Sequence, residues 1–173
     1  MITGEKINLR LIRNTEELEL VVNLYNDLNE RPEADHTEIK SVQSEINKFN
    51  ENGFWTDNSG KLLITDKNEN IFGEISFNRT TDFELELGYR IFNKENFANG
   101  IMTESLKLFS RYLFSTKPVR RLKLQINENN KASIKLAERC GFKKEGVLRE
   151  AYFYRNQFCD FIIFGLLRNE CMR

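Results

Sequence analysis

The residues with the clearest chemical potential lie over 97–104, where the sequence reads Phe-Ala-Asn-Gly-Ile-Met-Thr-Glu. A stretch with the alternation of a β-strand precedes this junction, and an amphipathic helical pattern follows it. Gly100 has no Cβ and Ala98 has the smallest one, so a ligand can approach this backbone closely. The first turn of a helix also leaves N–H groups without internal partners, at the positive end of the helix dipole. The junction is therefore a candidate phosphate or pyrophosphate site, although an ordinary strand–helix turn shows the same pattern.

Residues that ligate metals or form covalent intermediates are few. Cys140, Cys159 and Cys171 show no Cys-x-x-Cys spacing, and no histidine lies near Cys140 in the sequence. We expect reduced thiols in a cytoplasmic protein, with Cys140 acting as a small buried apolar residue and not as a nucleophile. His36 is the only histidine, so no histidine metal cluster can form and no metal site is expected. His36 itself is expected at the surface, with contact to a substrate as the alternative.

Composition narrows the class of protein. The length of 173 residues fits one domain, 1–173. Lysine plus arginine and aspartate plus glutamate number 26 each, so there is no global positive field and nucleic-acid binding is not expected. No apolar run approaches the ~18 residues of a membrane span, and the first residues do not resemble a signal peptide. We expect no membrane partner.

Periodicity supplies the elements that must position the junction. Alternating apolar residues predict strands over 7–11, 62–64, 71–77, 85–91 and 122–126, and two more in the tail 147–167 around a turn at 155–157. Helical spacing predicts helices over 15–28, 39–49, 102–114 and 133–140, the last opened or capped by Ser133 and ended by Gly141. Residues 50–60 are predicted to be a loop. The fold class is therefore α/β, with a mixed sheet flanked by about four helices.

Two segments in this order resemble a known family. Residues 86–92 (Glu-Leu-Gly-Tyr-Arg-Ile-Phe) followed by 99–104 resemble the coenzyme A motif of the GNAT N-acetyltransferases. Residues 130–133 and 137–146 resemble the downstream motif of the same superfamily. Both are most similar to the branch that includes the ribosomal-protein N-terminal acetyltransferases. The resemblance covers nearly the whole chain and implies the GNAT fold, with a mostly antiparallel central sheet.

The resemblance also implies acetyl-CoA as co-substrate. The coenzyme would be held by a set of residues around the two motifs: Ile91, Phe92, Phe97, Ala98, Asn99, Gly100, Ile101, Met102, Asn130, Ser133 and Arg139. The phosphate loop departs from the family pattern, which has a basic or aromatic residue, then Gly, a basic residue and Gly. Ala98 replaces the first glycine, and the basic residues are absent. Backbone N–H groups can still hold a pyrophosphate if Ala98 avoids a positive φ, which would cost it about 1 kcal/mol or more.

The family reaction transfers an acetyl group to an amine, which must be neutral to attack the thioester. Some GNAT enzymes place a catalytic glutamate on the strand before the phosphate loop, and Glu86 is the candidate base on that strand. Glu74 and Glu84 are weaker candidates. The alternative for Glu86 is a solvated side chain or a partner of Arg90.

By the same resemblance, Asn130 would hydrogen-bond the pantetheine arm and Ser133 would lie near the sulfur, where its hydroxyl could protonate the departing thiolate. A helix cap is the alternative role for Ser133. Tyr152 and Tyr154 could supply the proton instead, although packed strand residues are the plainer expectation. Arg139 would reach a coenzyme phosphate or remain a surface charge.

The acceptor amine stays open between a peptide N-terminus and a small molecule such as a polyamine or an aminoglycoside-like amine. Acidic residues over 28–60 would favour a cationic acceptor if they converge, and a solvated helix face is the alternative. Direct transfer in a ternary complex is expected, with a homodimer as a possible assembly. The rival hypotheses are a non-catalytic acyl-CoA sensor with the same fold and transfer of another acyl group, such as succinyl.

Overall fold

The protein, described here by a computed structural model over residues 1–30, 38–93, 99–154 and 156–171, is built around one sheet. The strands are β1 (Ile2–Thr3), β2 (Asn8–Arg10), β3 (Ser59–Thr65), β4 (Ile71–Thr81), β5 (Glu84–Ile91), β6 (Arg121–Asn127), β7 (Lys143–Tyr154) and β8 (Gln157–Leu167). The helices are α1 (Thr15–Asn26), α2 (Val42–Asn52), α3 (Ile101–Thr116), α4 (Lys131–Arg139) and α5 (Arg168–Cys171). The mixed α/β class is confirmed.

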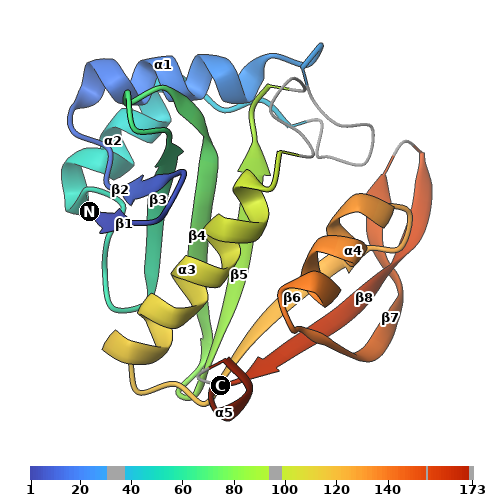
Figure 1. Cartoon of the computed structure of the whole chain (residues 1–173). Coiled ribbons are helices and arrows are strands. Elements are labelled where there is room, and N and C mark those ends of the chain that lie inside the picture. The colour runs from blue at the N-terminus through green and yellow to red at the C-terminus, as the bar shows by residue number, and fades with distance from the viewer. Residues whose placement is uncertain (31–37, 94–98, 155, 172–173) are drawn as a thin grey trace.

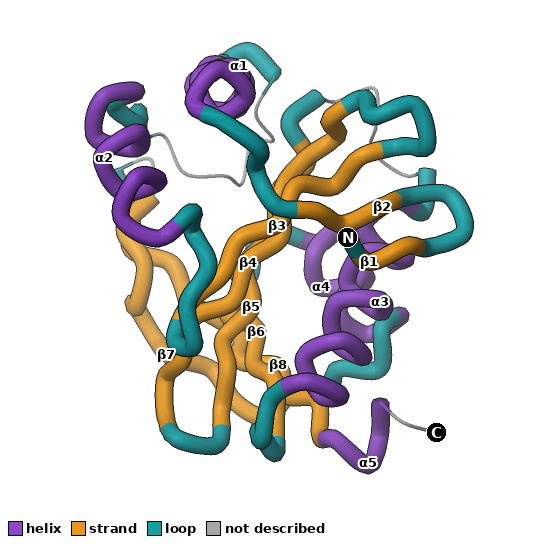
Figure 2. Tube along the Cα trace, turned by 90° about the vertical axis from the view of Figure 1, so that its left-hand side faces the viewer, coloured by secondary structure: helices purple, strands orange, loops and turns teal. Residues whose placement is uncertain are grey.

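The sheet has the order β1-β2-β3-β4-β5-β6-β8-β7. Among the described strands the neighbours pair antiparallel, except β5 and β6, which pair parallel. Helices α3 and α4 cover one face of the sheet, and α1 and α2 cover part of the other (Figure 2). Strands β6, β8 and β7 turn away from β5, so the sheet opens towards one end (Figure 1).

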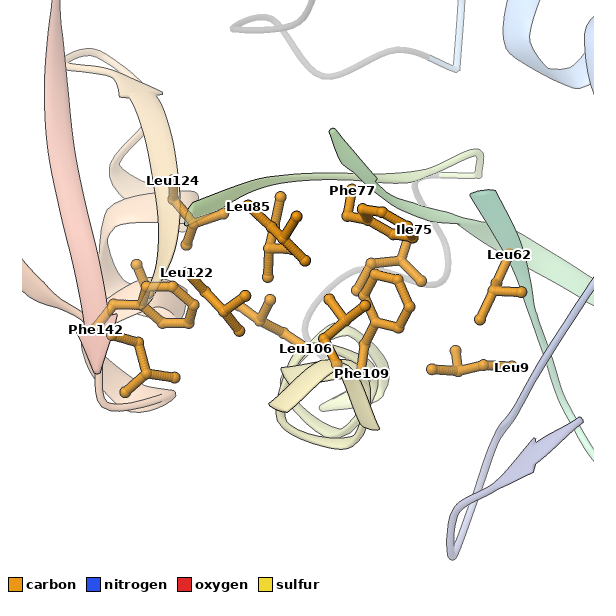
Figure 3. Packing of buried hydrophobic residues seen from close by; sticks show 14 of the residues in the cluster. Leu9, Leu62, Ile75, Phe77, Leu85, Leu106, Phe109, Leu122, Leu124 and Phe142 are labelled. Carbon is orange, nitrogen blue, oxygen red and sulfur yellow. The ribbon is translucent and has the colours of Figure 1, made fainter. Parts of the chain in front are cut away.

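The main core lies between the sheet and α3. Alternating strand residues such as Ile75, Phe77 and Leu85 point towards the stripe of α3 that carries Leu106 and Phe109 (Figure 3). All five are fully buried. The Phe77 and Phe109 ring centroids are 6.3 Å apart. The predicted periods of the strands and of the helix thus meet in one apolar layer.

A second apolar cluster fixes α1 on the opposite face. Val21 and Val22 of α1 pack with Leu63 of β3 and with Phe92, which directly follows β5. Helix α1 begins after Asn14, whose side chain accepts a hydrogen bond from the Glu17 N–H. The two clusters hold the sheet from both sides at β3 to β5.

The turn after α4 follows the predicted pattern. Gly141 has φ +89°, and its N–H donates to the Glu138 carbonyl while the Phe142 N–H donates to the Ala137 carbonyl. This pair of bonds is a Schellman motif, which requires a residue with positive φ. The start of α4 differs from the expectation: Asn130 is the N-cap and accepts from the Ser133 N–H at 3.0 Å. The prediction that Ser133 caps this helix is wrong.

Other differences lie at element ends. Strand β3 begins at Ser59 and α2 extends to Asn52, both inside the loop predicted over 50–60. Helix α1 ends at Asn26, so Leu28 is 51% exposed, and Ile39 is 69% exposed because α2 begins only at Val42. Apolar residues at helical spacing thus extend beyond the end of α1 and before the start of α2. In the segment between them, the Asn26 side chain binds the Lys40 backbone. The two-residue β1 and the four-residue α5 are too short to show a period.

Candidate active site

The site lies where β5 and β6 separate. Their parallel ladder pairs 84–86 with 121–123, and the strands then continue apart to Ile91 and Asn127. A cleft of about 410 Å³ occupies this position. Its walls include Leu87, Gly88 and Tyr89 of β5 and residues 124–127 of β6. Because neither strand has the other as a ladder partner there, the facing backbone edges can pair with a ligand.

Glu86 lies in the cleft wall with a 31% exposed side chain. Its Oε2 accepts a hydrogen bond from Gln125 Nε2 at 2.7 Å and lies 2.9 Å from Lys123 Nζ. Lys123 Nζ is also 3.5 Å from Glu84 Oε1. The charges on this face therefore alternate, and both donors to Glu86 come from β6. The Arg90 guanidinium lies 3.8 Å from the centre of the Tyr25 ring.

Ser133 and Tyr89 meet on the other side of the cleft. Both line it, and the buried Tyr89 hydroxyl has no hydrogen-bond partner among the described residues. Burial raises the pKa of Tyr89 to about 12, and the nearby Ser133 side chain opposes this shift. The phenol therefore keeps its proton throughout the neutral range. Asn130 also lines the cleft, with its Oδ1 engaged as the α4 cap.

The expected phosphate loop is described from Asn99 onward, while Phe97 and Ala98 lie outside the described residues. Gly100 is the N-cap of α3 with φ +77° and ψ −4°, a left-handed conformation that favours glycine. A Cβ added there would meet no atom within 4 Å, so this backbone is open to approach. Ile101 is buried in the main core and Met102 packs against it. Their contribution to a phosphate site would be backbone N–H groups.

Among the described residues predicted to hold the coenzyme, Asn130 and Ser133 line the cleft, whereas residues 91, 92, 99–102 and 139 are not part of its walls. The Phe92 side chain belongs to the second apolar cluster, and its N–H donates to the Phe72 carbonyl at 2.9 Å. Ile91 packs against the main core, and Arg139 is exposed in the last turn of α4. Of the alternative acids, Tyr152 lines the cleft but its ring stacks on Phe161 at 4.9 Å.

The remaining wall of the cleft is polar and comes from distant parts of the sequence. Tyr25 of α1, Lys40, Glu74 and Ser76 of β4 and Arg90 of β5 line it. Lys40 Nζ lies 3.6 Å from the Tyr25 ring centre and 3.8 Å from Glu74 Oε1. The sequence did not indicate Lys40, Tyr89 or the two β6 donors, Lys123 and Gln125, as parts of the site. Alternation with Leu87 placed Tyr89 on the buried face of its strand, so its burial was predictable and its place in the cleft was not.

Neither the thiols nor the acidic groups suggest other chemistry. Burial raises the pKa of Cys140 to about 11, which disfavours the thiolate, and His36 lies outside the described residues. No group of three or more histidine, cysteine, aspartate or glutamate side chains is arranged for a metal ion in the described ranges. The described helices include none that is long and apolar enough to span a membrane. Glu45, one of the acidic residues over 28–60, is buried and paired with Lys48 at 2.7 Å.

Comparison with known proteins gives a consistent family. Residues 6–143 match the model of the acetyltransferase (GNAT) domain. An uncharacterized N-acetyltransferase, p20 of Bacillus licheniformis, is 23% identical over 136 residues, which cover 78% of this chain and 76% of that protein. The ribosomal-protein-serine acetyltransferase of Escherichia coli is 28% identical over 58% of this chain and 56% of its own length. A spermidine N-acetyltransferase of Vibrio cholerae, solved with CoA and spermine, has a TM-score of 0.84 at 18% identity, covering 98% of this chain and 100% of that one.

Proposed function

The chain belongs to the GNAT acetyltransferase family, and from that premise we propose that it transfers an acetyl group from acetyl-CoA to the primary amine of a small molecule or a peptide N-terminus. The observation that carries the proposal is the cleft between β5 and β6, which is lined by Glu86, Asn130 and Ser133 and has a polar wall. Both substrates would meet there and react directly, without a covalent intermediate on the protein.

The residues present fit acetyl-CoA. The first turn of α3 offers N–H groups and the positive end of a helix dipole to the pyrophosphate, and Gly100 leaves room for it. The unpaired edge of β5 beyond Glu86 suits an extended arm that carries amides. Acetyl-CoA, when bound, supplies the activated acyl group. The side chains of the protein would bind and orient the substrates and transfer the protons.

Glu86 is the proposed proton acceptor. A lysine-type amine with a pKa near 10.4 needs about 4.6 kcal/mol for deprotonation at pH 7, whereas an α-amino group needs far less. A carboxylate on the acceptor side, directly or through a water molecule, would lower this cost. Lys123 and Gln125 fix the Glu86 carboxylate in the wall of the cleft.

Ser133 is the proposed donor to the departing thiolate. Tyr89 stays protonated and its buried hydroxyl has no partner among the described residues, so we propose that it donates to the Ser133 oxygen when the substrates are bound, which would leave the serine proton directed towards the sulfur. Tyr89 would then be a positioning residue. Asn130 would keep the start of α4 in place through its cap, and any contact with the pantetheine arm would use its amide.

The decisive experiment measures release of free CoA thiol from acetyl-CoA with a panel of amines. The panel should include polyamines, aminoglycosides and peptides with free N-termini. Saturable turnover with one class supports the proposal. Saturable CoA binding without turnover on any amine would favour the acyl-CoA sensor, and faster turnover of succinyl-CoA would favour the other acyl group.

We further propose that the protein works in the cytoplasm as a homodimer. Its three cysteines are free thiols, as in a reducing compartment. Strand β7 is the outer edge of the sheet, and Val147, Leu148, Phe153 and Phe158 on the β7–β8 pair are exposed. A second copy that covers them would remove an unpaired edge. Sedimentation equilibrium that gives the mass of one chain would contradict this assembly.

A further inference from the structure

Lys40 is held at the cleft by its backbone. Its N–H donates to Asn26 Oδ1 at 2.8 Å, and Asn26 Nδ2 donates to the Lys40 carbonyl at 2.8 Å. This reciprocal pair fastens Lys40 to the last residue of α1, although fourteen positions separate them in the sequence. The side chain then extends into the wall of the cleft.

The groups that face Lys40 come from five elements. They are Tyr25 of α1, Glu45 of α2, Lys61 of β3, Glu74 of β4 and Arg90 of β5. The side chain is 26% exposed. Burial, with the repulsion of Lys61 and Arg90, lowers the pKa of Lys40 to about 8, against the opposing attraction of the two carboxylates.

This environment gives a large neutral fraction. At pH 7.5 an ordinary lysine is neutral in about one molecule in 800, and an amine with a pKa of about 8 is neutral in about one in four. Neutral amines are the nucleophiles of the proposed reaction. The polar wall of the cleft therefore contains a fixed amine, of which about a quarter is in the reactive form at pH 7.5.

We propose that Lys40 is a self-acetylation site, modified by acetyl-CoA bound in the same cleft. The inference rests on the proposed function. The neutral Nζ attacks the thioester carbonyl, a C–N bond forms, the C–S bond breaks, and the proton lost by nitrogen passes to the thiolate. The products are Nε-acetyl-Lys40 and free CoA. Acetylation removes the charge of Lys40 and makes the polar wall of the cleft bulkier, so turnover of the amine substrate falls.

Lys61 is the matched comparison within the same chain. Its Nζ lies 3.4 Å from Glu74 Oε2, so it shares a partner with Lys40. Lys61 is not part of the cleft wall and lies over the Phe54 ring, at 4.8 Å from its centre. Self-acetylation through the cleft therefore selects Lys40 over Lys61, and Glu74 keeps Lys61 as a partner afterwards.

The test is to incubate the full chain with acetyl-CoA alone, and to follow intact mass and proteolytic peptides by mass spectrometry. We expect one acetyl group at Lys40, with a first-order rate independent of protein concentration and about 15-fold slower at pH 6.5 than at pH 8. Excess CoA should suppress the labelling, and Lys40→Arg should abolish it. Equal labelling of Lys61, or labelling of Lys40 that excess CoA does not suppress, would mean ordinary chemical acetylation and would overturn the inference.

The same samples are assayed with the amine panel. If amines are acetylated and Lys40 is not, the self-acetylation inference fails and the proposed function stands. If neither is acetylated, both fail. Labelled Lys40 without amine turnover supports the inference and shows that the cleft transfers acetyl groups.

Discussion

Substitution of Glu86 by Gln separates a catalytic carboxylate from a structural one. The amide keeps the shape of the side chain and removes its charge and its basicity. The lost ion pair with Lys123 is partly exposed on both sides, so the stability cost should not exceed about 1 kcal/mol. Loss of a general base lowers turnover by about 10²- to 10⁴-fold. At 1.36 kcal/mol per factor of ten, this raises the barrier by about 3 to 5 kcal/mol, far above the structural effect.

Glu84→Gln is the matched control. Glu84 lies two residues away on the same strand face and also pairs with Lys123, yet it is not part of the cleft wall. Glu86→Gln should unfold in urea within about 1 kcal/mol of the wild type, and Glu84→Gln should be the more destabilised of the two because Glu84 also contacts Arg121 Nε at 2.7 Å. Only Glu86→Gln should lose kcat, measured by CoA-thiol release at saturating acetyl-CoA. Equal kcat in the two variants, within a few-fold, would show that Glu86 serves only as an ion-pair partner of Lys123 and takes no part in the reaction.

Four further outcomes are expected. Gly100→Ala should lower stability by about 1–2 kcal/mol because φ is +77°, and should raise the KM for acetyl-CoA more than it lowers kcat. Tyr89→Phe should lower kcat about five-fold, worth about 1 kcal/mol, and should have no further effect when Ser133 is already Ala. Phe109→Ala should cost about 3–5 kcal/mol in urea unfolding, since Phe109 is fully buried. Lys40 binds its proton less tightly folded than unfolded, so stability should rise with pH between about 8 and 10.5, by up to about 3 kcal/mol, and this rise should be absent in Lys40→Met.

Local pattern predicted most of the architecture. Strands β4 and β5 and helix α3 each bury one face, so their apolar residues repeat with the period of a strand or of a helix and could be predicted from the sequence. The junction at Gly100 was also readable, since the strand, the small residues and the helix are contiguous. Element ends were less predictable. Helical spacing continued to Leu28, but Asn26 uses its side chain to bind the Lys40 backbone, and α1 ends there.

The polar part of the site could not be read from local pattern. Gln125 lies 39 residues from Glu86, and their contact depends on the three-residue ladder that aligns β6 with β5. Lys40 Nζ lies 3.8 Å from Glu74 Oε1, and the Asn26 side chain holds the Lys40 backbone. Both contacts depend on tertiary placement, which periodicity does not encode. Of the acidic residues over 28–60, Glu45 has a carboxylate that is paired with Lys48.

The short ladder between β5 and β6 links the fold to its chemistry. Beyond Glu86 and Lys123 each strand keeps its antiparallel neighbour, β4 or β8, so the separated segments remain ordered. Their facing backbone groups would cost about 1–3 kcal/mol each if they were buried without a partner. An open cleft lets water or an extended amide chain satisfy them. A preformed edge of this kind selects a ligand that can act as a partial strand, and the helix end at Gly100 selects one with a negative charge. Together these two features favour an amide-bearing diphosphate such as coenzyme A over a simple nucleotide, so a nucleoside diphosphate without the pantetheine arm should bind far more weakly than coenzyme A.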